Sequence, residues 1–243
     1  IWYAVFMVPF LWWVREPVQT GKVFSLRIAL TELGRLISGL RHRPSMATWL
    51  VSSMLSRDAL NALYGFGGVY AGTVLGWPVI LSGIFGIVSV VSAAGIAWLG
   101  GRADRLWGPK PVIIAATLAL LMVCIVIVSM ARNAIFGIPL AKESSVPDVV
   151  FFLCGALIGG AGGAMQAASR SLTVRHTSAT RATEAFGLYA LSGKATAFLA
   201  PFLIARMTDL TGSQRIGVSP LIVMFLLAIF LLQWVNKNGE TEQ

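Results

Sequence analysis

Long apolar runs alternate with short polar gaps along the whole chain. Six runs are long enough for a helix to cross a bilayer, because about 20 helical residues span a hydrocarbon core of roughly 30 Å. A shorter, aromatic-rich run at 1–14 precedes them and predicts the end of another spanning helix. The six predicted helices cover residues 46–75, 77–99, 111–130, 149–169, 184–207 and 218–235.

The polar stretch 15–45 separates the first run from the six predicted helices. Its apolar residues recur at spacings of three and four, which predicts an amphipathic helix on a membrane surface. They are Val23, Leu26, Leu30, Leu33, Ile37 and Leu40. A partly ordered linker is the alternative. We therefore expect a linker at 15–45, a six-helix transmembrane half at 46–236 and a tail at 237–243.

Composition supports an integral membrane protein. The chain is 56% hydrophobic and 12% charged, with a mean hydropathy of +0.78, whereas soluble domains have about 25% charged residues. The net charge of +9 does not indicate nucleic-acid binding, because the basic residues lie mainly in the gaps between apolar runs. We expect the lipid bilayer as a partner, and no nucleic acid.

The basic residues also predict the orientation. If the predicted helices alternate in direction, one side of the membrane carries Arg15, Lys22, Arg27, Arg35, Arg41, Arg43, Arg102, Arg105, Lys110, Arg170, Arg175, Arg181 and Lys237. The other side carries Arg132, Lys142, Arg206 and Arg215. The richer side should be cytoplasmic, which also places the C-terminal tail in the cytoplasm.

No motif of enzyme chemistry stands out. Cys124 and Cys154 fall inside apolar runs and are expected to be packed, reduced thiols. The sequence has no metal-ligand spacing and no nucleotide-binding or nucleophile motif. We therefore expect no enzyme activity, no metal and no cofactor. Because the chain starts at Ile1 inside an apolar run, we also expect that an upstream part is missing.

The predicted helix at 46–75 carries two adjacent charges, Arg57 and Asp58. Charged groups at that depth cost several kcal/mol unless they face protein or water. Arg57, Asn61 and Tyr64 share one stripe, whereas Asp58 lies on a face rotated by about 100°. Arg57 and Asp58 are therefore not expected to pair with each other.

Two other helices supply further polar candidates. Lys194 lies on a stripe of small residues in the helix at 184–207, which also contains Pro201, and Gln166 lies near the end of the helix at 149–169. In one interpretation these groups form a central polar site. Arg57 and Lys194 would attract a carboxylate, and Asp58 would bind an ammonium or carry a proton. In the other, a buried salt bridge between Asp58 and Lys194 holds the helices together.

The helix at 149–169 also carries small-xxx-small pairs. Gly155 and Gly159, and Gly159 and Gly163, are each four residues apart. Such pairs allow two helices to approach closely. Tight helix packing is the role that we expect for them.

The stretch GGRADRLWGPK follows the predicted helix at 77–99. Its Gly100, Asp104, Arg105, Gly108 and Lys110 resemble the loop signature of the major facilitator superfamily, with Trp107 lengthening the spacing by one residue. The resemblance implies a gating loop in which the glycines let helices approach, Asp104 accepts from a neighbouring helix end and the two cations anchor at the leaflet. A basic tight turn is the alternative.

Further stretches at 56–77, 169–172, 184–203 and 211–215 resemble the Unknown Major Facilitator family, the bacterial relatives of the vacuolar amino-acid effluxers. The resemblance implies an all-α integral membrane fold in the bacterial inner membrane. This chain would be the sixth helix, the linker and the C-terminal six-helix bundle of a twelve-helix secondary transporter. A small polar solute, such as an amino acid, and the missing N-terminal half would be its partners. The alternative is a non-transporting, scaffold-like half that packs on a partner.

Overall fold

The computed structural model describes residues 2–13, 26–141, 144–178 and 181–239. It divides into two units, Ile1–Ser38 and Gly39–Gln243, and each is described by itself. The first unit contains the helix α1 (Trp2–Trp13) and most of α2 (Leu26–Gly39). Helix α2 is strongly amphipathic, as the spacing of its apolar residues predicted. The predicted stripe begins at Val23, which lies outside the described residues.

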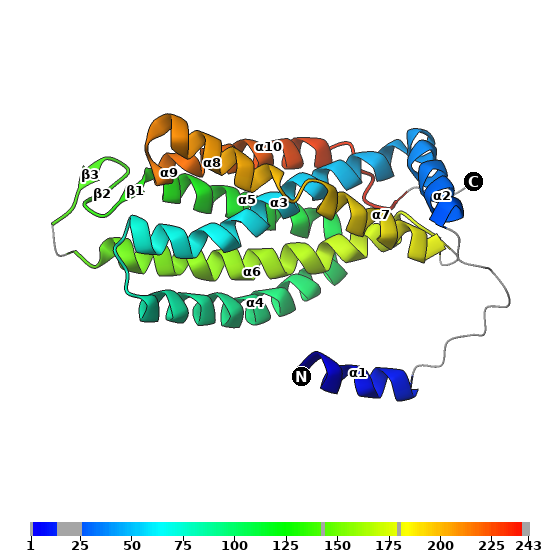
Figure 1. Ribbon diagram of the computed structural model, residues 1–243, viewed down its shortest axis with the longest axis horizontal. Helices are drawn as coiled ribbons and strands as arrows, with labels where there is room; N and C mark the ends of the chain where they lie inside the picture. Colours follow the sequence, from blue (N-terminus) through cyan, green and yellow to red (C-terminus); the bar gives the residue numbers. More distant parts are fainter. Residues whose placement is uncertain (1, 14–25, 142–143, 179–180, 240–243) are drawn as a thin grey trace. The chain divides into compact units, whose positions relative to one another are not determined.

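The second unit is a bundle of long helices that lie side by side (Figure 1). After a short 3-10 turn at Leu40–His42, they are α3 (Pro44–Thr73), α4 (Val79–Trp107), α5 (Pro109–Ser129), α6 (Val146–Arg175), α7 (Ala182–Ala195), α8 (Leu199–Thr211), α9 (Gln214–Gly217) and α10 (Ser219–Leu232). The fold is therefore mostly helical. The predicted helix at 184–207 is interrupted, because α7 ends at Ala195 and α8 begins at Leu199.

Five stretches of the described chain are long and apolar enough to cross a membrane. They are Val79–Trp107, Pro109–Ser129, Val146–Arg175, Ala182–Thr211 and Gln214–Leu232. Helix α3 has the length, 30 residues, but is more polar than these five. Its polar side chains are mostly buried, including Ser52, Ser53, Ser56 and Asp58, so the protein interior accommodates them.

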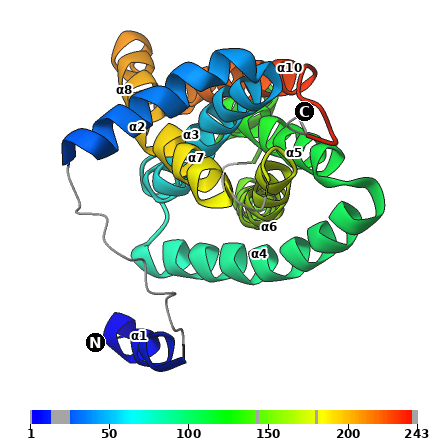
Figure 2. The same ribbon diagram turned by 90° about the vertical axis from the view of Figure 1, so that its right-hand side faces the viewer.

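Helix α6 organises the packing of this unit. It packs most extensively against α4 and α5, and α10 packs against α3 and α5. Helix α4 lies on the outside of the bundle (Figure 2), and none of its residues is buried. A Cβ at Gly155 would collide with the Phe85 ring, and one at Gly159 would collide with the Ser89 carbonyl of α4. The prediction that these glycines serve tight helix packing is confirmed.

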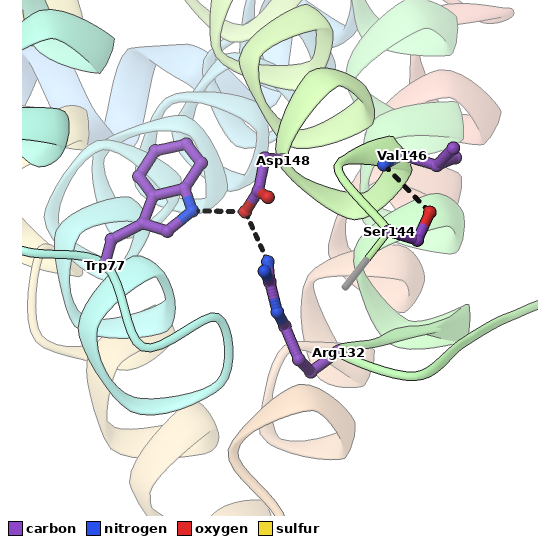
Figure 3. Close-up of polar contacts among 5 residues, drawn as sticks. All are labelled: Trp77, Arg132, Ser144, Val146 and Asp148. Carbon is purple, nitrogen blue, oxygen red and sulfur yellow. Dashed lines mark hydrogen bonds and ion pairs between the residues drawn. The ribbon is translucent and has the colours of Figure 1, made fainter. Parts of the chain in front are cut away.

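Two ends of the bundle can be distinguished. The strand end contains three two-residue strands that the sequence did not predict: β1 (Met130–Ala131), β2 (Ala134–Ile135) and β3 (Ile138–Pro139), which form an antiparallel sheet in that order. At this end Asp148 accepts hydrogen bonds from the Trp77 indole and the Arg132 guanidinium, both at 2.6 Å (Figure 3). This contact ties together the α3–α4 connection, the strands and the start of α6.

The Gly108 end contains the turn between α4 and α5, the start of α3 and the end of α6. The prediction of a helix end at 99 followed by a loop at 100–110 is wrong, because α4 continues to Trp107 and α5 begins at Pro109. Nothing between 100 and 107 stops a helix. Gly108 adopts a positive φ of 86°, a conformation that favours glycine, and it forms the whole turn.

Candidate functional site

A polar pocket of about 290 Å³ lies between α3, α6 and α7. It is lined by Arg57, Leu60, Asn61, Gln166, Tyr189, Ala190, Gly193 and Lys194. Four of the six residues predicted for a polar pathway therefore meet around one space. At 1.5 Å per residue, Arg57 lies about 20 Å along α3 from the Gly108 end, which is close to the middle of a bilayer core.

The Arg57 side chain is held in place by α7. Its Nη2 donates to the Tyr189 carbonyl at 2.7 Å and lies 3.4 Å from the Ser192 hydroxyl. The guanidinium carbon stands 3.9 Å from the centre of the Tyr189 ring, within the range of a cation–π interaction. Gly193 permits this approach, because a Cβ there would collide with the guanidinium. Sequence reasoning missed Tyr189, which has no periodic signal of its own.

The charges that line this pocket are both positive. Arg57 and Lys194 contribute them, Asn61 and Gln166 add amide groups, and none of the pocket residues carries a carboxylate. Asn61 and Lys194 are exposed, whereas Arg57 and Gln166 are partly buried. The pocket is therefore suited to an anionic group such as a carboxylate. Because Asn61 and Lys194 are exposed, α3, α6 and α7 do not enclose it completely.

Tyr64 does not line the polar pocket. It borders a neighbouring cavity of about 430 Å³ between α3, α4 and α6. Its hydroxyl lies against Gly162, where a Cβ would collide with it, and near the amide of Gln166. The structure thus places Tyr64 beside the pocket, behind Gln166.

Asp58 also lies apart from the pocket. The residue is 1% exposed, and no group in the described part of the chain completes a hydrogen bond to either carboxylate oxygen. The Thr196 hydroxyl and Arg57 are its polar neighbours. Among the described residues no ion pair joins Asp58 to Arg57 or Lys194, so the structure shows neither a pair between these two neighbours nor the structural salt bridge.

A third cavity continues from the polar pocket toward the strand end. It measures about 380 Å³, lies between α3 and α8, and shares Asn61 with the pocket. Thr208, Asp209 and Gln214 are among its lining residues. Sequence reasoning missed them, because Asp209 follows the predicted helix and Gln214 lies in a connection.

Four of the five predicted gating residues lie on helices rather than in a loop, and Gly108 forms the turn between α4 and α5. Gly100 contacts α6, where its Cβ would come within 2.8 Å of Ala164 Cβ, so the expectation of close approach holds there. Arg105 is exposed. No hydrogen bond or ion pair is formed by the Asp104 side chain within the described ranges. The expectation that Asp104 accepts from a neighbouring helix end is therefore not met.

Lys110 contacts protein carbonyls rather than standing free at a leaflet. Its ammonium donates to the Gln233 carbonyl at 3.1 Å and to the Val235 carbonyl at 2.8 Å. These carbonyls follow α10, so the cation neutralises the negative end of that helix. Lys110 thus caps α10, a contact that the sequence did not predict.

A buried polar network at the Gly108 end was not predicted. His176, which directly follows α6, is fully buried and shares a 2.8 Å hydrogen bond with the Ser45 hydroxyl. The Ser45 oxygen also accepts from the Asn236 backbone at 2.8 Å. Ser45 and His176 lie 131 positions apart along the chain, so no local sequence pattern could reveal their contact.

Comparison with known proteins gives two matches. Residues 1–243 match the family described as vacuole effluxer Atg22 like. The chain is also 24% identical over 243 residues to the uncharacterized MFS-type transporter YxiO of Bacillus subtilis (strain 168), an alignment that covers 99% of this chain and 53% of that protein. The chain thus spans about half the length of the curated relative that it matches.

Proposed function

Because the chain belongs to the vacuole effluxer Atg22-like family of major-facilitator-type transporters, we propose that it forms the C-terminal half of a secondary active transporter working by alternating access. It is a multi-pass membrane protein of a transporter family rather than an enzyme. In this proposal the solute binds between this half and an N-terminal half. Rocking of the two halves exposes the bound solute first to one side of the membrane and then to the other.

The transported solute is a small polar molecule with a carboxylate, such as an amino acid. The observation that carries this proposal is the meeting of Arg57, Asn61, Gln166 and Lys194 around one pocket. Two cations without a lining acid favour an anionic group, and the amides can hydrogen-bond it. The pocket volume, about 290 Å³, suits a small solute. The exposure of Asn61 and Lys194 leaves room for a second half to close the site.

The Gly108 end would face the cytoplasm. Arg102, Arg105 and Arg175 lie at this end of the helices, and the positive-inside rule favours it. The amphipathic helix α2 would then lie on the cytoplasmic surface, between the two halves.

Solute uptake tests the proposal. The complete protein, as the cell makes it, is reconstituted in liposomes, and a panel of labelled amino acids is screened under a proton or sodium gradient. For a transported solute, Lys194→Ala should raise the KM by about tenfold or more, because a lost charged hydrogen bond is worth about 1.5–3 kcal/mol. Lys237→Ala is the matched control, since this exposed lysine lies outside the pocket.

A second comparison tests the carboxylate. An amine that lacks the carboxylate of the best amino acid should compete poorly against it in the wild type. If Lys194→Ala and Arg57→Met both kept the wild-type KM, the pocket would not be the place where the solute binds. If the complete protein moved no solute of the panel under either gradient, the scaffold-like alternative would replace transport.

A further inference from the structure

The break between α7 and α8 lies midway along a membrane-spanning stretch. Residues 196–198 separate the two helices within Ala182–Thr211, and the interruption is visible beside α3 in Figure 1. Pro201 explains it, because proline has no N–H and its ring clashes with the carbonyl four residues earlier. That carbonyl belongs to Ala197.

The break changes the backbone hydrogen bonds around it. The Leu199 N–H donates to the Thr196 carbonyl at 2.7 Å, so the Ala195 carbonyl loses the donor that a continuous helix would supply. The Ala197 carbonyl loses its donor to Pro201. Two backbone oxygens on either side of Thr196 are therefore released at mid-membrane depth, where unsatisfied carbonyls are costly.

Asp58 faces this break from α3. Its two carboxylate oxygens and the Thr196 hydroxyl are buried neighbours, and within the described residues none of these three oxygens completes a hydrogen bond of good geometry. Helices α7 and α8 both contact α3, which brings the groups together. A buried carboxylate without hydrogen bonds costs several kcal/mol, and a native structure that keeps one calls for an explanation.

The charges around Asp58 favour a ligand of low positive charge. Arg57 is the cation next to it, but its Nη2 donates to the Tyr189 carbonyl and its guanidinium stands over the Tyr189 ring. The buried Nε of Arg57 has no hydrogen-bond partner among the described residues. Lys194, two residues before Thr196, is exposed and lines the polar pocket. Neither cation pairs with Asp58, yet both would oppose a divalent ion at that position.

We infer that Asp58, Thr196 and the released carbonyls of Ala195 and Ala197 form a binding site for a monovalent hard cation, by its chemistry sodium. The donor set consists only of oxygen atoms, the type that hard cations select. One carboxylate balances one positive charge. Interrupted helices whose free carbonyls coordinate an ion at the membrane midplane are a general design of coupled transporters.

The site begins two residues after Lys194, just past the end of α7. Lys194 lines the pocket and Thr196 lines the cation site, so an ion there would hold the α7–α8 break in one conformation and with it the pocket wall. Only this coupling role rests on the proposed function. The binding of the ion itself does not.

Binding of radioactive sodium tests the inference. The complete purified protein should bind it saturably at constant pH, with competition by unlabelled sodium and not by an equal concentration of potassium. Asp58→Asn should abolish this binding. Thr196→Val, which keeps the side-chain shape, should weaken it by about tenfold or more, whereas Thr196→Ser keeps the hydroxyl and should bind nearly as the wild type does.

Asp209→Asn is the matched control, because it neutralises an exposed acid of α8 that lies outside the site. Gel filtration of each variant verifies folding, and Thr196→Val decides the matter if Asp58→Asn does not fold. Absence of saturable sodium binding in the wild type would overturn the inference, as would unchanged binding in Thr196→Val. Solute uptake driven by protons alone would overturn the coupling role of the ion, while leaving the binding of the ion and the proposed transport intact.

Discussion

The glycine stripe of α6 allows a quantitative prediction of stability. At Gly159, a Cβ would collide with the Ser89 carbonyl oxygen and lie 2.7 Å from its carbonyl carbon and 3.0 Å from its Cα. These are backbone atoms of α4, which cannot rotate away as a side chain can. Gly159→Ala therefore requires the two helices to separate by about 1 Å, since non-bonded carbon atoms prefer about 3.5–4.0 Å.

The expected loss of stability follows from two opposing effects. Overpacking of a tight contact costs about 1–3 kcal/mol, and replacing a helical glycine by alanine returns up to about 1 kcal/mol. The net loss should be about 1–2 kcal/mol. At about 2–4 °C per kcal/mol, the Tm should fall by about 2–8 °C. The loss should stay moderate because other contacts, such as those of Phe85 with Gly155 and Phe151, also hold α4 on α6.

The buried cysteines provide a readout within the bundle. Cys124 and Cys154 are 0% and 3% exposed, so a thiol reagent modifies them when the bundle opens. Peptide mass spectrometry after heating in detergent gives a Tm for each site in the complete protein. Gly95→Ala is the control, since a Cβ there meets no atom within 4 Å, and its Tm should equal or exceed that of the wild type. Equal Tm values for the two variants would refute the close contact between α4 and α6.

Two further predictions concern the pocket and the strand end. Gly193→Ala should displace the Arg57 guanidinium and raise the solute KM by about tenfold, with little change in Tm because a flexible side chain can move. Gly187→Ala is the control and should keep the wild-type KM, because a Cβ there meets nothing within 4 Å. Equal KM values for the two variants would contradict the placement of Arg57. Asp148→Asn removes the ion pair with Arg132, whose side chain is 38% exposed, so Tm should fall by only about 1–4 °C at low salt. This difference should shrink in high salt, and an unchanged Tm at low salt would show that the pair does not stabilise the strand end.

Much of the architecture could be predicted from local pattern. The lengths of the apolar runs predicted the helices of the bundle, because each must satisfy its backbone hydrogen bonds internally in a membrane. Helix ends were less predictable. The stretch 100–107 looked like a loop because it is polar and begins with two glycines, but polarity does not stop a helix, and α4 ends only where Gly108 adopts a positive φ.

The interruption between α7 and α8 shows a similar limit. Pro201 is visible in the sequence, but the consequence of a proline within a helix depends on what lies beside it. Only the packing of α3 against α7 and α8 brings Asp58 close to the Thr196 side chain at the break.

The sequence by itself determined that this protein is a helical membrane protein and that Arg57 and Asp58 face different directions, because helical periodicity sets the direction of each side chain within one helix. Only the tertiary structure decided which helices meet. Glycine contacts such as Gly159 against Ser89 set the register between neighbours, and that register brings Gln166 and Lys194 to Arg57. Contacts between distant segments depend on the packing of whole helices, which no local pattern encodes.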